Sequence, residues 1–361
     1  MEKIFKNKKV LIFIAMFFIC AATVRAATII FASEEASYDN TTSNLEATNV
    51  QDAIDELYGK ANSCTKIDPA LLETSPVINT YINLNSPEVV TSGNGLYSDN
   101  SEGFTRFIYK GTSAGTNNYI YIKENGENVL YRIYSIESDG TVKVIRDENV
   151  TSMNFDVTDA TRRKGGYCTY DYCNAWAAMT GFVNGTYTGD VAGLTGNTGD
   201  SSIKEYIDNT YSATLDDYSK IVSKTWNISG TTRNRDTLEN AIADEKKSTW
   251  NGKIALLTAS EYVRANTNTS SCGTLANLYS NNSTCKSTNY LVRSSYWWLL
   301  SPNSGNRSTV LYVNSSSFVN LSNVSNSYGV RPSFYLCSGL TYSGKGTSSE
   351  PYYISGGSCK S

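Results

Sequence analysis

Residues 296–302 read YWWLLSP, and residues 329–334 read GVRPSF. Adjacent residues of a β-strand point to opposite faces, so we expect one of Trp297 and Trp298 to lie in the core and the other at the surface. Arg331 stands between a valine and a proline, where we expect its guanidinium to form a buried ion pair or to clamp backbone carbonyls rather than to contact a ligand. Each of these two stretches predicts a β-strand, and the two strands lie at either end of the segment described next.

The segment between them, residues 294–328, is neutral and polar. It contains 11 Ser, 6 Asn and 3 Tyr among 35 residues, with Arg307 as its only charge. Residues 310–313 and 318–324 are strand-like, a serine run separates them, and a second polar turn leads into a third strand over 328–336. In such a meander, Tyr side chains offer a large contact surface and lose little conformational entropy on binding. The neighbouring Ser and Asn side chains can adapt their hydrogen bonds to a partner. The predicted ligand-binding residues are Ser294, Tyr296, Trp298, Asn303, Asn306, Arg307, Tyr312, Asn314, Asn320, Asn323, Asn326 and Tyr328.

Upstream, strong turn signals predict a second group of strands. An Asn-Gly turn at 125–126 and an Asp-Gly turn at 139–140 connect three strands, 119–122, 129–136 and 141–146. This meander is the most securely predicted local structure of the chain.

Helical patterns occur between the two groups of strands. We expect a helix over 174–183, one or two within 202–226 and another over 236–246, followed by a buried strand over 253–257. Thr258-Ala259-Ser260-Glu261 has the form of a capping box and opens a further helix. Strands and helices in this order predict an α+β domain with small antiparallel sheets and short helices.

The N-terminus has the features of a secretory signal peptide. Four lysines lie within residues 1–9, an apolar run covers residues 10–23, and Val24-Arg25-Ala26 offers small residues for cleavage. The alternative is an uncleaved membrane anchor, because residues 27–32 are again apolar, although Arg25 interrupts the longer run. We therefore expect an exported protein, secreted or attached to the cell surface.

Cysteine usage agrees with an oxidising compartment. Three local pairs suggest themselves, and Cys64 is left over; the pairs are Cys168 with Cys173, Cys272 with Cys285, and Cys337 with Cys359. No C-x-x-C spacing and no histidine support a metal site, so disulfides are favoured. Spacing alone does not fix their connectivity.

Composition excludes several classes of function. The 361 residues contain no histidine, which removes Ser-His-Asp and Cys-His nucleophile systems and His-based zinc sites. Without residues 1–26 the chain has 26 positive and 33 negative charges, a net charge of −7, which disfavours binding of nucleic acid through phosphate neutralisation. We predict no cofactor and no catalytic activity. A glycan-active enzyme with two carboxylates among Asp156, Asp159, Asp171 and Glu261 is the alternative, although no motif aligns such a pair.

The motifs YWWLLSP and GVRPSF, with GKIALLTASEYVRA upstream, resemble an uncharacterised extracellular domain of bacterial surface proteins. That family is similar to the broad C-type-lectin-like and formylglycine-generating-enzyme-like fold, and the likeness spans roughly residues 118–336. The resemblance implies a compact mixed domain with two helices under a loop-rich antiparallel sheet. It implies no function by itself.

Two departures limit what this resemblance transfers. C-type lectins bind sugar through calcium with Glu-Pro-Asn or Gln-Pro-Asp and Trp-Asn-Asp signatures, whereas the nearest strings here are Ser301-Pro302-Asn303 and Trp250-Asn251-Gly252. These strings lack the carboxylates that calcium prefers. The catalytic cysteine pair of the sulfatase-activating enzymes has no counterpart either.

The resulting organisation has four parts. Residues 1–26 form the signal peptide or anchor, 27–66 a stalk with a short helix, 67–340 the lectin-like extracellular domain, and 341–361 a disulfide-pinned C-terminal hook. The stalk sequence YDNTTSNLEATNVQDAIDELYGK resembles segments of phage tail-fibre and bacterial surface proteins. Membrane contact is expected only through an uncleaved N-terminus.

The predicted function is adhesin-like binding of a protein or glycan partner at the cell surface through residues 294–328. The composition of this segment, rich in Ser, Asn and Tyr, resembles that of the variable region of target proteins diversified by retroelements. In those proteins adenine-directed mutation changes Asn codons. A polar solvent face without a binding role is the alternative for the same segment. A phage tail or receptor-binding component is a further alternative.

Overall fold

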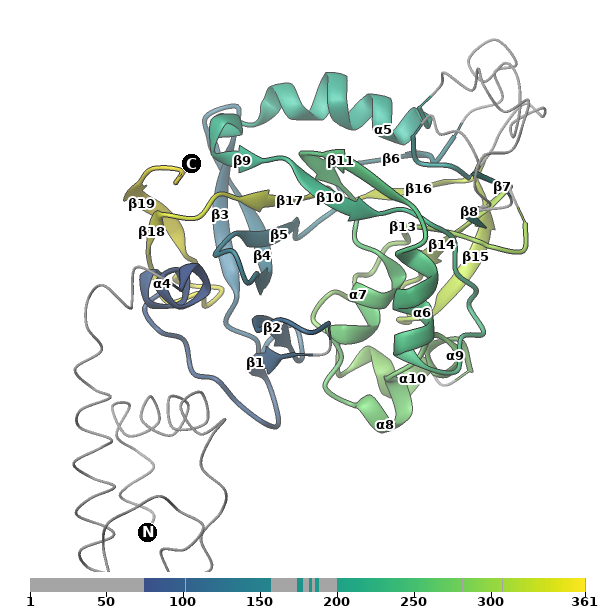
Figure 1. The fold of residues 1–361 in the computed structure, drawn as a ribbon, viewed down its shortest axis with the longest axis horizontal. Helices are drawn as coiled ribbons and strands as arrows, with labels where there is room; N and C mark the ends of the chain where they lie inside the picture. Colours follow the sequence, from purple (N-terminus) through teal and green to yellow (C-terminus); the bar gives the residue numbers. More distant parts are fainter. Residues whose placement is uncertain are drawn as a thin grey trace, which may run out of the picture. The chain divides into compact units, whose positions relative to one another are not determined.

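Two β-sheets contain most of the strands in the described part of the chain. The segment GVRP lies where the chain passes from one sheet to the other (Figure 1). The computed structural model describes residues 75–100, 102–156, 174–177, 182–183, 186–187, 200–280, 282–306 and 308–360. The residues from Ser75 onward form one compact unit. The expected signal peptide and stalk lie outside the described residues.

The first sheet has eight strands in the order β1-β2-β4-β5-β17-β12, with β3 paired to β4 and β9 paired to β17. The predicted meander is confirmed as β3–β4–β5, and Asn125 and Gly126 take the positive φ angles of 51° and 84° that its tight turn requires. The strands are β1 (Gly95–Asp99), β2 (Arg106–Lys110), β3 (Tyr119–Glu124), β4 (Glu127–Ile136), β5 (Val142–Arg146), β9 (Ile221–Val222), β12 (Ile254–Ala255) and β17 (Ser333–Leu336).

The second sheet has five strands in the order β15-β14-β13-β16-β6. The expected three-stranded meander is wrong at its last strand. Although β16 comes after β15 in the chain, it does not pair with β15; it pairs with β13 in parallel and with β6 antiparallel. All six residues of β13 are buried, so this strand needs a neighbour on each side. The strands are β6 (Thr151–Asn154), β13 (Trp297–Pro302), β14 (Thr309–Val313), β15 (Val319–Asn323) and β16 (Ser327–Val330).

The single strand predicted over 328–336 is divided at Arg331 and Pro332, so that its halves, β16 and β17, belong to different sheets. Proline has no N–H to donate to a ladder, which favours a break there. Arg331 is fully buried, and its guanidinium donates to the carbonyl oxygens of Arg146 (3.0 Å) and Leu291 (2.7 Å). The predicted carbonyl clamp is therefore confirmed, and it lies at the crossing between the sheets.

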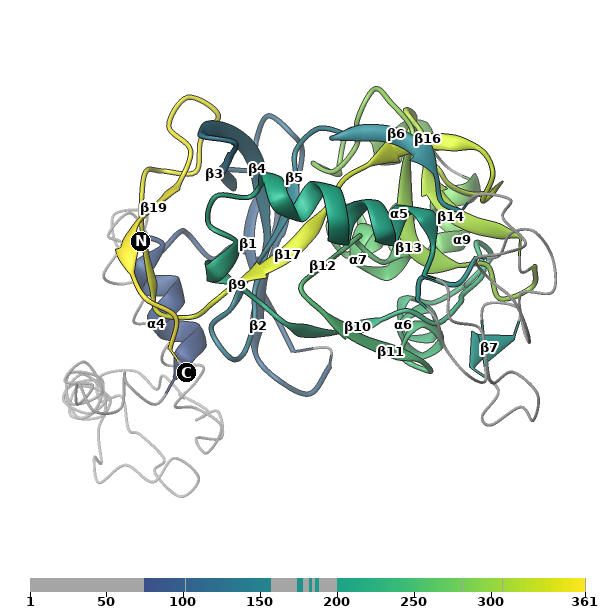
Figure 2. The ribbon, with the colours of Figure 1, turned by 90° about the horizontal axis from the view of Figure 1, so that it is seen from above.

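Short helices cover the sheets. The helical segment that begins with α5 runs across both sheets (Figure 2), and α6 to α10 lie together beside β13, β14 and β15 (Figure 1). The predicted helix over 236–246 is confirmed as α6, and α7 begins with the predicted capping box of Thr258 and Glu261. The helical elements are α4 (Pro76–Asn83), α5 (Ser202–Tyr206), η2 (Ile207–Tyr211), η3 (Ser212–Thr214), η4 (Tyr218–Lys220), α6 (Leu238–Glu245), α7 (Ala259–Arg264), α8 (Thr269–Cys272), α9 (Leu275–Ser280) and α10 (Asn282–Lys286).

The helix predicted over 174–183 is wrong in its described part. Residues 174–177 are not helical, and Phe182–Val183 forms a short strand, β7, paired with β8 (Thr186–Tyr187). Asn174 instead donates to the carbonyl oxygens of Asn303, Asn306 and Thr309 in the loop between β13 and β14. These long-range hydrogen bonds override the local helical pattern.

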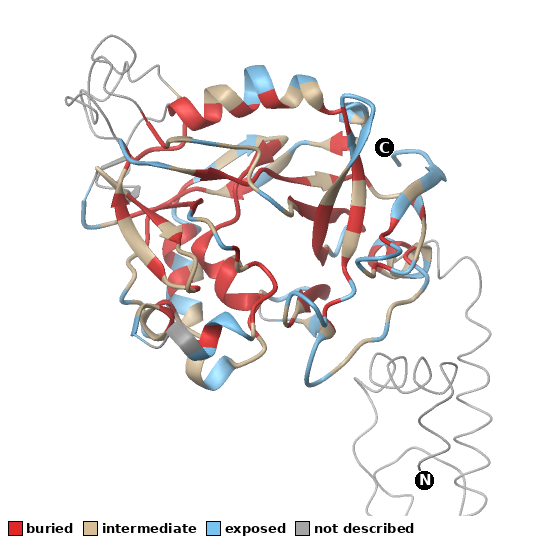
Figure 3. Cartoon of the chain, turned by 180° about the vertical axis from the view of Figure 1, so that it is seen from behind, coloured by how far each residue is buried: buried red, intermediate tan, exposed pale blue. Residues whose placement is uncertain are grey.

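The expectation that one of the adjacent tryptophans lies at the surface is also wrong, because Trp297 and Trp298 are both fully buried. Trp297 packs against Tyr262 of α7 on one face of β13, and Trp298 lies among aromatic rings on the other face. Figure 3 shows buried residues along the strands and exposed ones at turns. Both faces of β13 are therefore covered.

Two of the predicted disulfides are formed. Cys272–Cys285 joins α8 to α10, and Cys337–Cys359 closes the C-terminal hook of β18 (Leu340–Ser343) and β19 (Tyr353–Gly357). Cys64, Cys168 and Cys173 lie outside the described residues. The strands β10 (Lys224–Asn227) and β11 (Thr249–Gly252) pair with each other in a separate two-stranded antiparallel sheet.

Candidate ligand-binding site

Four aromatic side chains gather on one face of the second sheet. Tyr296 immediately precedes β13 and lies two positions before Trp298, and Trp298 is opposite Tyr312 in the β13–β14 ladder. Trp297 is paired with Gly329 across the β13–β16 ladder, which places Tyr328 beside Tyr296 and Trp298. Strand periodicity and register therefore direct these rings to the same face.

The three tyrosines form what we call the tyrosine platform, with Trp298 beneath it. Ring centroids are 4.6 Å apart for Tyr312 and Tyr328, 5.5 Å for Tyr296 and Tyr328, and 5.7 Å for Tyr296 and Tyr312. The Trp298 ring lies 4.7 Å from that of Tyr328 and is fully buried. Tyr296 is 43% exposed, so the platform rests on the core and presents ring surface to solvent.

Hydrogen bonds fix the ring of Tyr328 from the side. The hydroxyl of Ser322 donates to the Tyr328 hydroxyl (3.0 Å), and the amide of Asn326 donates to the Ser322 hydroxyl (2.8 Å). Such a chain restricts the ring rotamer before any ligand arrives. The platform is therefore preorganised.

At the other side of the platform, Asn320 is opposite Tyr312 in the β14–β15 ladder and accepts a hydrogen bond from the guanidinium of Arg233. Arg233 also lies over the ring of Tyr279, 4.1 Å from its centroid. This cation is the charged group that the site presents beside the platform.

The hydroxyl of Tyr312 stays protonated at neutral pH. Burial, followed by the neighbouring hydroxyls of Tyr328 and Tyr296, raises the pKa of Tyr312 to about 12. The platform therefore offers hydroxyls that both donate and accept, together with the positive charge of Arg233.

The tyrosine platform and its surroundings contain seven of the twelve predicted site residues. Tyr296, Tyr312, Tyr328, Asn320 and Asn326 form the platform and its polar edge, and the exposed Ser294 precedes Tyr296 by two positions. Trp298 belongs to the same cluster, but its burial makes it a support rather than a ligand contact, which corrects that prediction.

The remaining asparagines hold the turns of the segment. The side-chain oxygen of Asn314 accepts from the amides of Ser316 and Phe318, both at 2.9 Å. Those of Asn306 and Asn323 accept in the same way from Ser308 and Ser325. These are Asx turns, which shape the loops from within.

Asn303 is only 7% exposed, and its amide donates to Thr309 while its side-chain oxygen accepts from Gly305. These hydrogen bonds make it part of the β13–β14 loop and not a surface contact. Arg307 lies outside the described residues.

Sequence reasoning missed Arg233 and Tyr279. They come from the loop before α6 and from α9, far from the segment 294–328 in the chain. No local pattern distinguishes them, because their position depends on how α9 packs beside β15.

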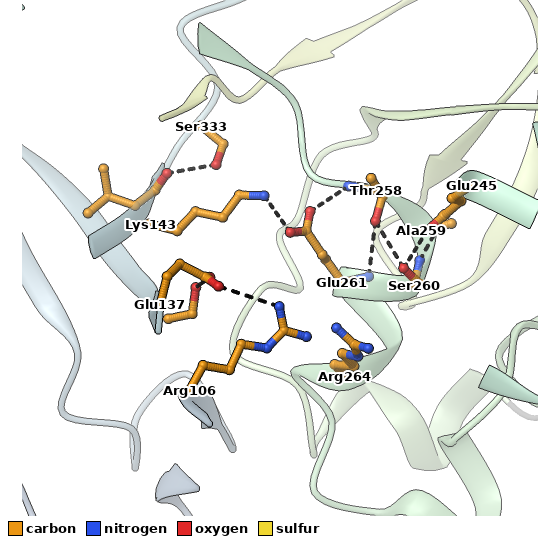
Figure 4. A network of polar contacts seen from close by, with 12 residues as sticks. Arg106, Glu137, Lys143, Glu245, Thr258, Ala259, Ser260, Glu261, Arg264 and Ser333 are labelled. Carbon is orange, nitrogen blue, oxygen red and sulfur yellow. Dashed lines mark hydrogen bonds and ion pairs between the residues drawn. The ribbon is translucent and has the colours of Figure 1, made fainter. Parts of the chain in front are cut away.

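The carboxylates considered for an enzyme have structural partners where they are described. Asp156 accepts from the backbone amide and hydroxyl of Ser202 at the start of α5, both at 3.2 Å. Glu261 completes the capping box of α7 and pairs with the ammonium of Lys143 (Figure 4). Asp159 and Asp171 lie outside the described residues.

Within the described ranges, no group of three or more Cys, Asp or Glu residues has the arrangement of a metal site. No helix in the same part of the chain is long and apolar enough to cross a bilayer.

A family described as a domain of unknown function (DUF6273) matches residues 196–338, fewer than half of the 361 residues. The matched region contains the platform and the helices α5 to α10. No curated protein and no solved structure matches the chain.

Proposed function

We propose that this protein is exported and binds a protein partner through the tyrosine platform. The observation that carries the proposal is the cluster of three tyrosine rings, preorganised over the buried Trp298 and joined to Arg233 through Asn320. Tyr, Trp and Arg contribute most of the binding energy in protein interfaces, and a Ser/Asn border allows adaptable hydrogen bonds.

The tilt of the rings favours a protein over a glycan. Tyr296 and Tyr328 are inclined by 74°, and Tyr312 and Tyr328 by 34°, so the rings do not form one flat stacking surface. Grooves between inclined rings accept side chains of another protein surface, whereas a sugar ring stacks on one flat face at a time. The positive charge of Arg233 favours a partner surface with few cations, because like charges across an interface repel.

Export is supported by the two disulfides, which persist in oxidising compartments, and by the N-terminal pattern of charge and hydropathy. The mixed α+β architecture agrees with the lectin-like scaffold that the motifs resemble. In this proposal the scaffold supplies rigidity and the platform supplies recognition.

The test compares two variants of the mature chain, one with the platform tyrosines replaced and one with exposed tyrosines elsewhere replaced. The platform variant carries Tyr296→Ala, Tyr312→Ala and Tyr328→Ala, and the control variant carries Tyr218→Ala and Tyr353→Ala at exposed positions elsewhere. Wild-type protein is used to select binders from a displayed library of extracellular protein fragments and, in parallel, from a glycan array.

We expect protein fragments whose affinity falls at least ~100-fold in the platform variant, as for loss of a hot-spot cluster, and is unchanged in the control. Glycan binding lost in the platform variant, with no protein binder, would replace the proposed partner class. Equal binding by the wild type and the platform variant would overturn the site.

A further inference from the structure

A second concave site lies where the end of β2 meets the helices α6, α7 and α8, and it shares no residue with the tyrosine platform. Its volume of about 370 Å³ is within the range of small-molecule sites. The lining residues are Lys110, Asp236, Thr237, Leu238, Glu239, Val263, Arg264, Asn266, Thr269, Gly273 and Thr274.

Asn266 gives this pocket an unsatisfied donor. The residue is 1% exposed, and its side-chain oxygen accepts from the amide of Asn268 at 2.9 Å. Its Nδ2 has no hydrogen-bond partner within the described part of the chain. A buried amide without a partner is unfavourable, so an acceptor that enters the pocket can supply the missing hydrogen bond.

Two cations, Lys110 and Arg264, line the floor of the pocket. Arg264 pairs with Glu102 at 2.6 Å, but the same carboxylate also pairs with Arg106 and Lys246. Lys110 has no carboxylate within ion-pair distance in the described residues, and its ammonium lies 5.0 Å from the ring centroid of Tyr97. Arg106 also pairs with Asp99 and Glu137, so the cations around Glu102 are largely neutralised and the ammonium of Lys110 is the charge that a ligand can reach.

The pKa of Lys110 reports the same environment. Burial lowers this pKa, Asp99 opposes the shift, and the charge of Arg264 adds to it. An anion beside Lys110 would favour the charged form and oppose this lowering of the pKa.

The rim carries the opposite charge. Asp236 and Glu239 stand at the start of α6 and are exposed. Glu239 has no hydrogen bond or ion pair with any described residue, and Asp236 receives only a long one (3.4 Å) from Asn240. The pocket therefore has a buried basic and amide floor beneath an exposed acidic rim.

We propose that this pocket binds a small zwitterion of the amino-acid or dipeptide class. Its carboxylate faces Lys110, Arg264 and the Nδ2 of Asn266, and its ammonium faces Asp236 and Glu239. The two charges of one molecule then match both walls, which a simple anion or cation does not. This inference does not depend on the proposed function of the tyrosine platform.

The experiment titrates the mature chain with alanyl-alanine and two blocked forms of it, followed by saturation-transfer NMR and calorimetry. N-acetyl-alanyl-alanine lacks the ammonium, and alanyl-alanine amide lacks the carboxylate. Each block is expected to weaken binding about tenfold or more, as for loss of one charge-assisted hydrogen bond.

Variants assign each wall of the pocket. Lys110→Met and Asn266→Asp should each weaken alanyl-alanine about tenfold. Asn266→Asp retains the oxygen that accepts from Asn268. The exposed Glu239→Gln should weaken alanyl-alanine but leave N-acetyl-alanyl-alanine unchanged, and Lys345→Met, on the C-terminal hook, should change neither.

Three outcomes would overturn the proposal. They are no saturable binding of alanyl-alanine up to ~10 mM, equal affinity for the free and both blocked dipeptides, or an effect of Glu239→Gln that is the same for free and N-acetylated forms. Glu239→Gln changes an exposed side chain, so this last comparison does not depend on whether a buried variant folds.

Discussion

The rings of Tyr312 and Tyr328 lie 4.6 Å apart although their strands, β14 and β16, are not neighbours in the sheet. Both rings lean across β13, which separates the two strands, and meet over Trp298. In this arrangement the Trp298 side chain belongs to the core, and the tyrosine rings above it form part of the molecular surface. The tyrosine platform and the packing of the second sheet are therefore one structure.

Trp298→Ala is expected to lower the free energy of unfolding by about 3–5 kcal/mol, because it removes a fully buried indole under the platform. It also removes the hydrogen bond from the indole nitrogen to the carbonyl of Met153 (2.9 Å). Urea denaturation followed by tryptophan fluorescence and circular dichroism measures the change. A loss below ~1 kcal/mol would mean that Trp298 does not support the sheet as described.

Asn314 and Asn320 form a matched pair of tests within one meander. Asn314→Ala removes the acceptor for two backbone amides and should cost about 1–2 kcal/mol of stability while leaving partner affinity within about twofold. Asn320→Ala should weaken partner binding at least ~5-fold, because it releases Arg233 from the platform edge. Thermal unfolding and binding isotherms of both variants check this, and the reverse pattern would contradict the assignment of roles.

Replacing Cys337 and Cys359 by Ala should cost about 3 kcal/mol, since this disulfide closes a loop with a sequence separation of 22. The pairing holds the hook of β18 and β19 and does not touch the platform. Partner binding at a temperature where the variant is folded should therefore match the wild type. Guanidinium denaturation gives the stability, and altered binding would show that the hook also positions the platform.

Stability between pH about 4.5 and 2 should depend on Glu102. Burial opposes its ionisation, but the hydrogen bond from Lys246 and the charges of Arg264 and Arg106 prevail and lower its pKa from 4.5 to about 2. A carboxyl whose folded-state pKa is lowered stabilises the protein above its unfolded pKa and loses that contribution as the pH falls through the folded one.

Glu102→Gln should therefore destabilise the protein at neutral pH and flatten the fall in stability over this window. Unfolding free energies at a series of pH values measure the effect. Glu88→Gln, an exchange of a carboxylate outside this network, serves as the control. A fall of equal steepness in the wild type and Glu102→Gln would remove Glu102 as its cause.

Features that depend on neighbours in sequence were predicted well. The Asn125-Gly126 turn fixes the β3–β4 hairpin because the positive φ angles are properties of those two residues. The capping box of Thr258 and Glu261 is confirmed for the same reason, since both partners lie within one helical turn. Residues 294–328 contain the three tyrosines of the platform, and their role in binding stays a prediction.

Features that depend on strand order were not predicted. The order places β16 beside β13 instead of β15, and this placement brings Tyr328 onto Trp298 and buries both tryptophans. The packing of α9 beside β15 adds Arg233 and Tyr279, and long-range hydrogen bonds of Asn174 prevent the helix expected there.

The sequence by itself determined the polar composition of residues 294–328, the tight turns and the helix start at Thr258, because each is set by residues close together in the chain. Only the tertiary structure decided which cysteines pair, which tyrosines share a face, which tryptophan supports them and which asparagines border the tyrosine platform. Those properties follow from the pairing of distant strands, and several pairings of the same strands satisfy the sequence pattern equally well.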